Sequence, residues 1–199
     1  MHPNKAFHWT YEAEMLRFIA ATGWSRIFIT TPAGPRVAHA PVIVDHAART
    51  LRFHLSRHNA VHDFVDGATG LALFEGPHAY VSANWYSEPE KQVPTWNYVA
   101  VECEGRVAAP SPDGLLPLLD ALAAEHEPAV GESWSRAMSD PAAITAMLSA
   151  ITLFELRITA LRGTRKLSQN SPSEVVRLAA AVERSGVADA AALMRDSKP

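Results

Sequence analysis

A segment rich in hydrogen-bond donors runs from residue 54 to residue 59 and reads His-Leu-Ser-Arg-His-Asn. It places a hydroxyl, a guanidinium and an amide within a few residues of one another. Because an arginine can bind a phosphate through two parallel hydrogen bonds, these residue types fit a phosphate site. The alternative is a polar strand edge that ends in a turn, and the segment taken alone favours that simpler interpretation.

The same stretch raises the question of a metal site, because His54, His58 and His62 are spaced four residues apart. Three residues at this spacing would share one face of a helix. The alternation of residues 50–56 predicts a strand instead, so only His58 and His62 could share a helical face. No third ligand is evident near them in the sequence. We therefore expect no metal site.

Two further segments carry residue types that suit a ligand. The first holds four large aromatic residues within fourteen positions, Trp85, Tyr86, Trp96 and Tyr98, and includes a Pro-bearing loop. Such rings can pack against an isoalloxazine, a purine or a haem, or they can fill the mouth of a barrel as core. The second, residues 165–170, reads Arg-Lys-Leu-Ser-Gln-Asn before a predicted helix start, which suits an anion or a ring edge as well as a solvated connector.

Other catalytic patterns are absent from the sequence. It contains no Gly-x-Ser-x-Gly elbow and no glycine-rich phosphate loop. The single cysteine, Cys103, lies in a predicted strand, where a plain buried thiol is expected rather than a nucleophile. One cysteine also excludes an internal disulfide and a multi-cysteine metal centre.

Period-two alternation predicts most of the elements that must position these segments. Residues 26–31, 37–44, 50–56, 69–75, 79–82 and 98–108 are expected as strands, with a break at Gly76-Pro77. A last strand is expected at residues 152–161. Helical spacing predicts helices at residues 10–22, near residues 115–127 and near residues 144–151. A final helix should start at Ser171, with Ser171 as its cap and Glu174 as the acid of a capping box.

This order of elements predicts a mainly β protein with helices, of the α+β class. Short strands joined by tight turns favour an antiparallel barrel, which the last strand would rejoin and close. We expect residues 1–170 to form the barrel domain and residues 171–199 to form a helical tail packed on the barrel or on a partner subunit.

Composition narrows the setting in which the protein works. The chain has 199 residues, a net charge of −3 and 48% hydrophobic residues, which is ordinary for a globular domain. The charge balance gives no strong pull toward nucleic acid or an anionic membrane. The N-terminal residues do not resemble a signal peptide, and no stretch is long and apolar enough to span a bilayer. We therefore expect a cytoplasmic protein without a membrane partner.

Several of these motifs, in this order, resemble the PaiB-type family of FMN-binding negative transcriptional regulators. The matching pieces are Pro3, Phe7, residues 39–41, residues 54–59, Trp85-Tyr86, residues 94–98 and residues 166–170. The Pro-Thr-Trp-Asn-Tyr and Lys-Leu-Ser-Gln-Asn pieces are specific, and the resemblance runs from about residue 1 to residue 170. The chain departs from the family pattern at His2, Ala40 and Ala60.

The resemblance implies a split β-barrel that forms a homodimer with FMN at the subunit interface, some pocket residues coming from across that interface. It assigns cofactor binding to three sets of residues. Those expected near the phosphate and the ribityl chain are His54, Leu55, Ser56, Arg57 and Asn59. Those expected near the ring are His39 and Pro41. Those expected to complete the pocket are Trp96, Asn97, Tyr98, Lys166, Gln169 and Asn170.

Three functions follow from this resemblance. A flavin-binding transcriptional regulator is implied by the family, although the sequence shows no helix-turn-helix, so DNA enters as a partner by the family name only. An FMN-dependent oxidoreductase similar to flavin reductases is the alternative, in which the flavin carries the electrons and the protein positions it. Haem binding is a third hypothesis, because the chain has nine histidines, none marked as an axial ligand.

Overall fold

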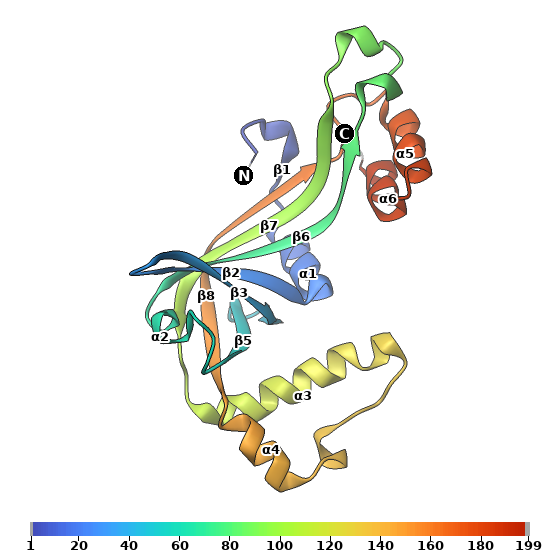
Figure 1. Cartoon of the computed structure of the whole chain (residues 1–199). Helices are drawn as coiled ribbons and strands as arrows, with labels where there is room; N and C mark the ends of the chain where they lie inside the picture. The colour runs from blue at the N-terminus through green and yellow to red at the C-terminus, as the bar shows by residue number, and fades with distance from the viewer. Residues whose placement is uncertain (1, 198–199) are drawn as a thin grey trace. The chain divides into compact units, whose positions relative to one another are not determined.

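The computed structural model describes residues 2–197, and Figure 1 shows the chain. The strands are β1 (His8–Trp9), β2 (Trp24–Thr31), β3 (Gly34–Pro41), β4 (Ile43–Asp45), β5 (Thr50–Ser56), β6 (Thr69–Val81), β7 (Thr95–Ala108) and β8 (Ile151–Lys166). The α-helices are α1 (Glu12–Thr22), α2 (His62–Val65), α3 (Leu115–His126), α4 (Pro141–Leu148), α5 (Val175–Arg184) and α6 (Ala188–Asp196). Short 3₁₀ helices occupy Lys5–Phe7, Ala83–Trp85, Pro89–Lys91, Pro112–Gly114, Pro128–Val130 and Arg136–Met138.

The strands form a sheet in the order β3-β2-β6-β7-β8-β5-β4, and β1 pairs with β8. The pairings β2–β3, β2–β6, β4–β5 and β5–β8 are all antiparallel. β3 and β5 stand far apart in this order, yet they approach each other closely, so the sheet curls round on itself. The predicted α+β class with an antiparallel split β-barrel is therefore confirmed.

β5 has the bounds and the two faces that its alternation predicts. Leu51, Phe53 and Leu55 are each at most 3% exposed. Phe53 stacks on Phe154 of β8, with 5.8 Å between the ring centroids. The residues between them, including His54, lie on the opposite face of the strand. This register fixes where the chain leaves the strand and enters the polar segment after Ser56.

Several sequence predictions about local structure are wrong: the strand expected at residues 37–44 is divided between β3 and β4, and the helix expected near residues 144–151 ends at Leu148. Residues 69–81 form one strand, so Gly76-Pro77 does not end it; Pro77 lies beyond Leu71–Leu73, the residues of β6 that pair with β2, where its missing N–H breaks no bond to β2. The capping box at Ser171 also does not form, because α5 begins at Val175. The Glu174 carboxylate instead accepts hydrogen bonds from the hydroxyl and the N–H of Ser87.

The chain divides into two compact units. The first unit comprises the residues up to Met15, Glu75–Glu102 and the residues from Arg162 onward, and in it α5 and α6 lie side by side (Figure 1). The second unit comprises Leu16–Phe74 and Cys103–Leu161. Within the second unit, leucines of α3 pack on Leu153 of β8 and form a separate hydrophobic cluster. Among the described residues, no helix is long and apolar enough to cross a membrane.

Candidate functional site

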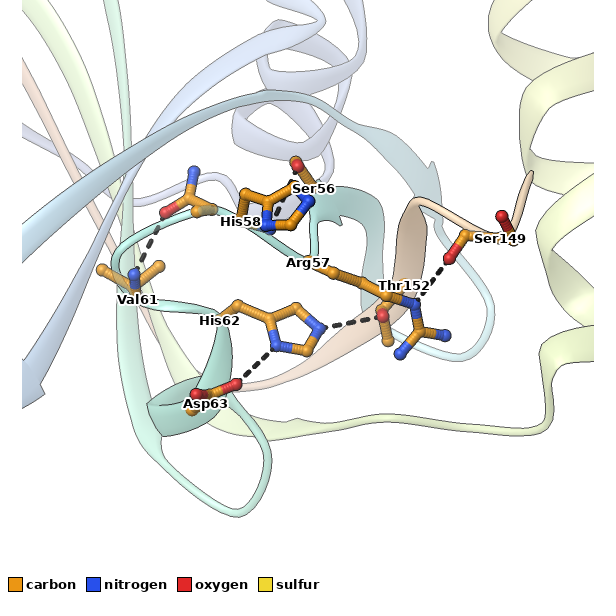
Figure 2. Close-up of polar contacts among 9 residues, drawn as sticks. Ser56, Arg57, His58, Val61, His62, Asp63, Ser149 and Thr152 are labelled. Atoms are coloured by element: carbon orange, nitrogen blue, oxygen red, sulfur yellow. Dashed lines mark hydrogen bonds and ion pairs between the residues drawn. The ribbon is translucent and has the colours of Figure 1, made fainter. Parts of the chain in front are cut away.

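The segment after β5 is tied at both ends to the residues that begin β8. At its start, the Arg57 N–H donates to the Ala150 carbonyl at 2.9 Å, and Arg57 Nε donates to the Ser149 carbonyl at 2.9 Å. At its end, His62 Nε2 lies 2.9 Å from the Thr152 hydroxyl oxygen (Figure 2). These contacts join residues about ninety positions apart, so they fix residues 56–61, which we call the β5 loop.

Inside the β5 loop, side chains stabilise the turn with their acceptor atoms. Ser56 Oγ accepts a hydrogen bond from the His58 N–H at 3.2 Å, and Asn59 Oδ1 accepts one from the Val61 N–H at 3.1 Å (Figure 2). The Ser56 hydroxyl proton, the Asn59 NH₂ group and the two terminal nitrogens of Arg57 bond to no other described residue. Ser56 and Arg57 are exposed and Asn59 is half-buried. The loop therefore offers a set of donors of the kind that binds an anion.

His54 lies on β5, shortly before Ser56, the first residue of this donor set. Burial lowers the pKa of His54, since taking the charged ring out of water is unfavourable. Its Nδ1 atom is buried and has no hydrogen-bond partner among the described residues. Leu55, in contrast, packs its side chain into the core, so only its backbone can reach a ligand. On β3, His39 is exposed and stacks on Trp24 at 6.4 Å, and Pro41 is half-buried opposite Trp24.

The predicted residues of the first unit have a different hydrogen-bonding pattern. Asn97 and Ser168 are buried and bond to each other, Asn97 Nδ2 donating to Ser168 Oγ at 2.8 Å. Gln169 accepts from the Leu167 N–H at 2.8 Å and donates to the carbonyls of Arg165 and Ala6. The polar atoms of these side chains form hydrogen bonds that stabilise the turn after β8, where Ser168 has a positive φ of 65°.

Lys166 also bonds within the first unit, because its ammonium donates to the Thr95 hydroxyl and, at 2.6 Å, to the Trp96 carbonyl. Burial lowers the pKa of Lys166. Asn170 is exposed in the turn that follows.

The aromatic residues of the first unit leave a ring surface open to solvent. Trp96 is 54% exposed and contacts His78 and Tyr80, with centroid separations of 5.9 and 6.0 Å. Trp96 and Tyr98 line a cavity of about 240 Å³ together with His78. Aromatic edges and faces of this kind suit a planar ligand. Tyr86, by contrast, is buried.

The sequence did not reveal the residues that support the β5 loop. Ser149, Thr152 and His62 act through contacts across long sequence separations, which no local pattern signals. His62, considered above as a metal ligand, bonds to Thr152 and, through Nδ1, to Asp63 at 2.9 Å. No cluster of three or more metal-binding side chains is present among residues 2–197.

The sequence matches a protein family and a protein of known name. Residues 1–160 match the model of a family described as "Putative FMN-binding domain". The chain is 27% identical over 180 residues to protease synthase and sporulation protein PAI 2 of Bacillus subtilis, which covers 85% of this chain and 83% of that protein.

Two solved structures show the same fold. The FAD and haem binding protein of Mycobacterium smegmatis matches with a TM-score of 0.60 and 14% identity, over 80% of this chain and 73% of that one. The flavocytochrome Anf3 of Azotobacter vinelandii matches with a TM-score of 0.64 and 12% identity, over 83% of this chain and 72% of that one.

Proposed function

The chain belongs to the family described as "Putative FMN-binding domain", whose cofactor is FMN, and on that premise we propose that the β5 loop holds the FMN phosphate. One observation carries this assignment. Ser56, Arg57 and Asn59 each fix the loop with one atom and keep N–H or O–H donors that no described residue bonds. A phosphate has only acceptor oxygens at neutral pH, so this donor set fits it.

The remaining predicted residues are proposed to hold the rest of the cofactor. Trp96 and Tyr98 would contact the isoalloxazine ring, because they offer aromatic surface beside a cavity. Asn97, Lys166 and Gln169 would shape that surface, since their polar groups fix the strands and the turn behind it. The residues proposed to complete the pocket are His39, Pro41, His54, Leu55 and Asn170. When bound, FMN supplies electron-transfer chemistry that no side chain has.

We propose that the working form is a homodimer with FMN at the subunit interface. The two groups of site residues belong to different units of the chain, one to the second unit and one to the first. In the same proposal, residues 1–170 form the FMN-binding domain and residues 171–199 the helical tail.

The proposed biological role is that of a PaiB-type negative transcriptional regulator. Its support is the similarity to the Bacillus protein named for protease synthesis and sporulation. A titration of the FMN-loaded protein with duplex DNA at several salt concentrations tests a direct role. Sequence-specific, salt-sensitive binding is expected. Its absence, together with turnover of a nicotinamide by the flavin, would identify an FMN-dependent oxidoreductase instead.

An absorbance spectrum of the purified protein tests the cofactor assignment, with the released cofactor identified by mass. Flavin bands and released FMN are expected, either as isolated or after FMN is added. Arg36→Ala is the matched control for a lost arginine, because Arg36 is exposed and, within residues 2–197, bonds only to the carbonyl of its neighbour Pro35. A colourless protein that does not bind added FMN would contradict the proposal, and a Soret band would point to haem.

A further inference from the structure

Two hollows that open to solvent lie beside α4. A cavity of about 440 Å³ lies between α4, the start of α3 and the start of β8, and a second cavity of about 360 Å³ adjoins it. Leu116, Thr145 and Leu148 line both cavities. Small-molecule sites occupy roughly 300–1,000 Å³. The space is therefore of the size of a ligand site.

α4 itself is an apolar helix that packs on the leucine cluster of α3 and β8 through the half-buried Leu148. Its sequence is Pro-Ala-Ala-Ile-Thr-Ala-Met-Leu, and none of its residues is buried. Met147 is 60% exposed. An apolar helix normally packs one face on a core, and in α4 Leu148 does so while Leu148 and Thr145 also line the cavity. An apolar occupant of the cavity would add to these contacts.

Most polar side chains that line the larger cavity already have hydrogen-bond partners within the chain. Thr145 and Ser149 donate their hydroxyl protons to the carbonyls of Pro141 and Ala146. Asp113 Oδ2 accepts from the Ser111 hydroxyl at 2.9 Å. The Thr152 hydroxyl pairs with His62 Nε2 at 2.9 Å, and His62 Nδ1 pairs with the Asp63 carboxylate. The terminal N–H groups of Arg57 remain, so the cavity has apolar walls, one open cationic donor group at Arg57 and one acidic side chain, Asp113.

We propose that this cavity binds a small amphipathic carboxylate, with the carboxylate on Arg57 and the hydrocarbon chain among Leu116, Leu148 and Leu153. An apolar wall recognises the chain through burial of its surface, and a guanidinium recognises the carboxylate through paired hydrogen bonds. Because Arg57 is also assigned to the FMN phosphate, the carboxylate and FMN compete for it. That competition rests on the proposed function, whereas carboxylate binding itself does not.

Calorimetric titration of the full-length protein with decanoate, and with decanol as its uncharged counterpart, tests the proposal. Decanoate is expected to bind to one site per chain. Arg57→Gln should weaken decanoate binding about tenfold or more and leave decanol binding unchanged. Arg36→Gln, which removes an exposed arginine elsewhere in the second unit, should change neither. Thr145→Trp, at an exposed position of α4, should weaken both ligands by filling the space.

The outcomes separate this proposal from the FMN assignment. Added FMN should lower the apparent affinity for decanoate in the wild type. No decanoate binding at millimolar concentration, or equal losses in Arg57→Gln and Arg36→Gln, overturns the carboxylate site even if FMN binds normally. Decanoate binding through Arg57 in a protein that does not bind FMN overturns the proposed function instead. Binding of decanoate with no effect of FMN overturns the competition.

Discussion

The two groups of predicted site residues use similar side chains in opposite ways. In the β5 loop, Ser56 and Asn59 accept backbone hydrogen bonds and keep their donors unbonded within the described chain. In the first unit, Asn97 and Gln169 bond to neighbouring side chains and carbonyls. An amide in a motif therefore has two distinct uses, to contact a ligand or to build the turn that presents other residues. The hydrogen-bond partners distinguish them, and the residue type alone does not.

The largest effect expected on FMN affinity comes from Arg57→Ala. It removes a guanidinium that the Ser149 carbonyl already holds in place, so FMN binding should weaken by about 1.5–3 kcal/mol. The side chain is exposed, so the melting temperature should change little. Fluorescence titration with FMN measures the affinity, with Arg36→Ala as the control. Unchanged affinity would remove Arg57 from the phosphate site.

Asn97→Ala should have the complementary effect, on stability. It leaves the buried Ser168 hydroxyl without its partner, and the free energy of unfolding should fall by about 1–3 kcal/mol. Asn59 is half-buried, so Asn59→Ala should lower the free energy of unfolding less than Asn97→Ala does. It should weaken FMN binding more than Asn97→Ala does. Urea unfolding and FMN titration of both variants provide the comparison. A larger stability loss in Asn59→Ala than in Asn97→Ala would contradict the distinction between the two groups.

Thr152→Val tests whether the support beneath the β5 loop positions the phosphate donors. The hydroxyl holds His62, and its loss should weaken FMN binding by about 1 kcal/mol. Riboflavin, which has no phosphate, should bind unchanged. Thr152→Ser keeps the hydroxyl and should restore FMN affinity. An equal loss for FMN and riboflavin would mean that Thr152 serves general stability and not the loop.

The smallest effect expected is a change in the pH dependence of stability through His54. Burial lowers the pKa of His54 below its usual value near 6.5, so the unfolded chain binds the proton more readily. The stability that the neutral ring contributes is present above pH 6.5 and is lost as the pH falls toward the folded pKa. His54→Gln should flatten this part of the curve. Urea unfolding between pH 5 and pH 8 measures it, and identical slopes would contradict the assignment.

Local pattern predicted the parts of the fold that depend on local physics. The alternation of residues 50–56 correctly predicted the bounds of β5 and its buried face. Gly23, expected to end the first helix, follows α1 with a positive φ of 61°. The break expected at Gly76-Pro77 was wrong, because pairing in the sheet carries β6 through it. The cap expected at Ser171 failed because Glu174 bonds to Ser87, a contact across 87 positions.

Only the polar segment of the candidate site was evident in the sequence. The donors of residues 56–59 stand together there, so they suggested an anion site, although the segment taken alone favoured a polar strand edge. Ser149 and Thr152 support that loop from positions about ninety residues away in the sequence, and no local sequence pattern identifies them. The internal bonding of Asn97 and Gln169 was equally hidden, since it depends on which groups the folded turn brings within reach.

The most direct test of the account is the ratio of FMN to riboflavin affinity in the wild-type protein and in Arg57→Ala. The two ligands share the ring and the ribityl chain and differ in the phosphate. We predict that the wild type prefers FMN by at least about tenfold, which corresponds to one charge-assisted group of hydrogen bonds, and that Arg57→Ala loses most of that preference. Equal affinities for the two ligands in the wild type would show that the β5 loop does not hold the phosphate.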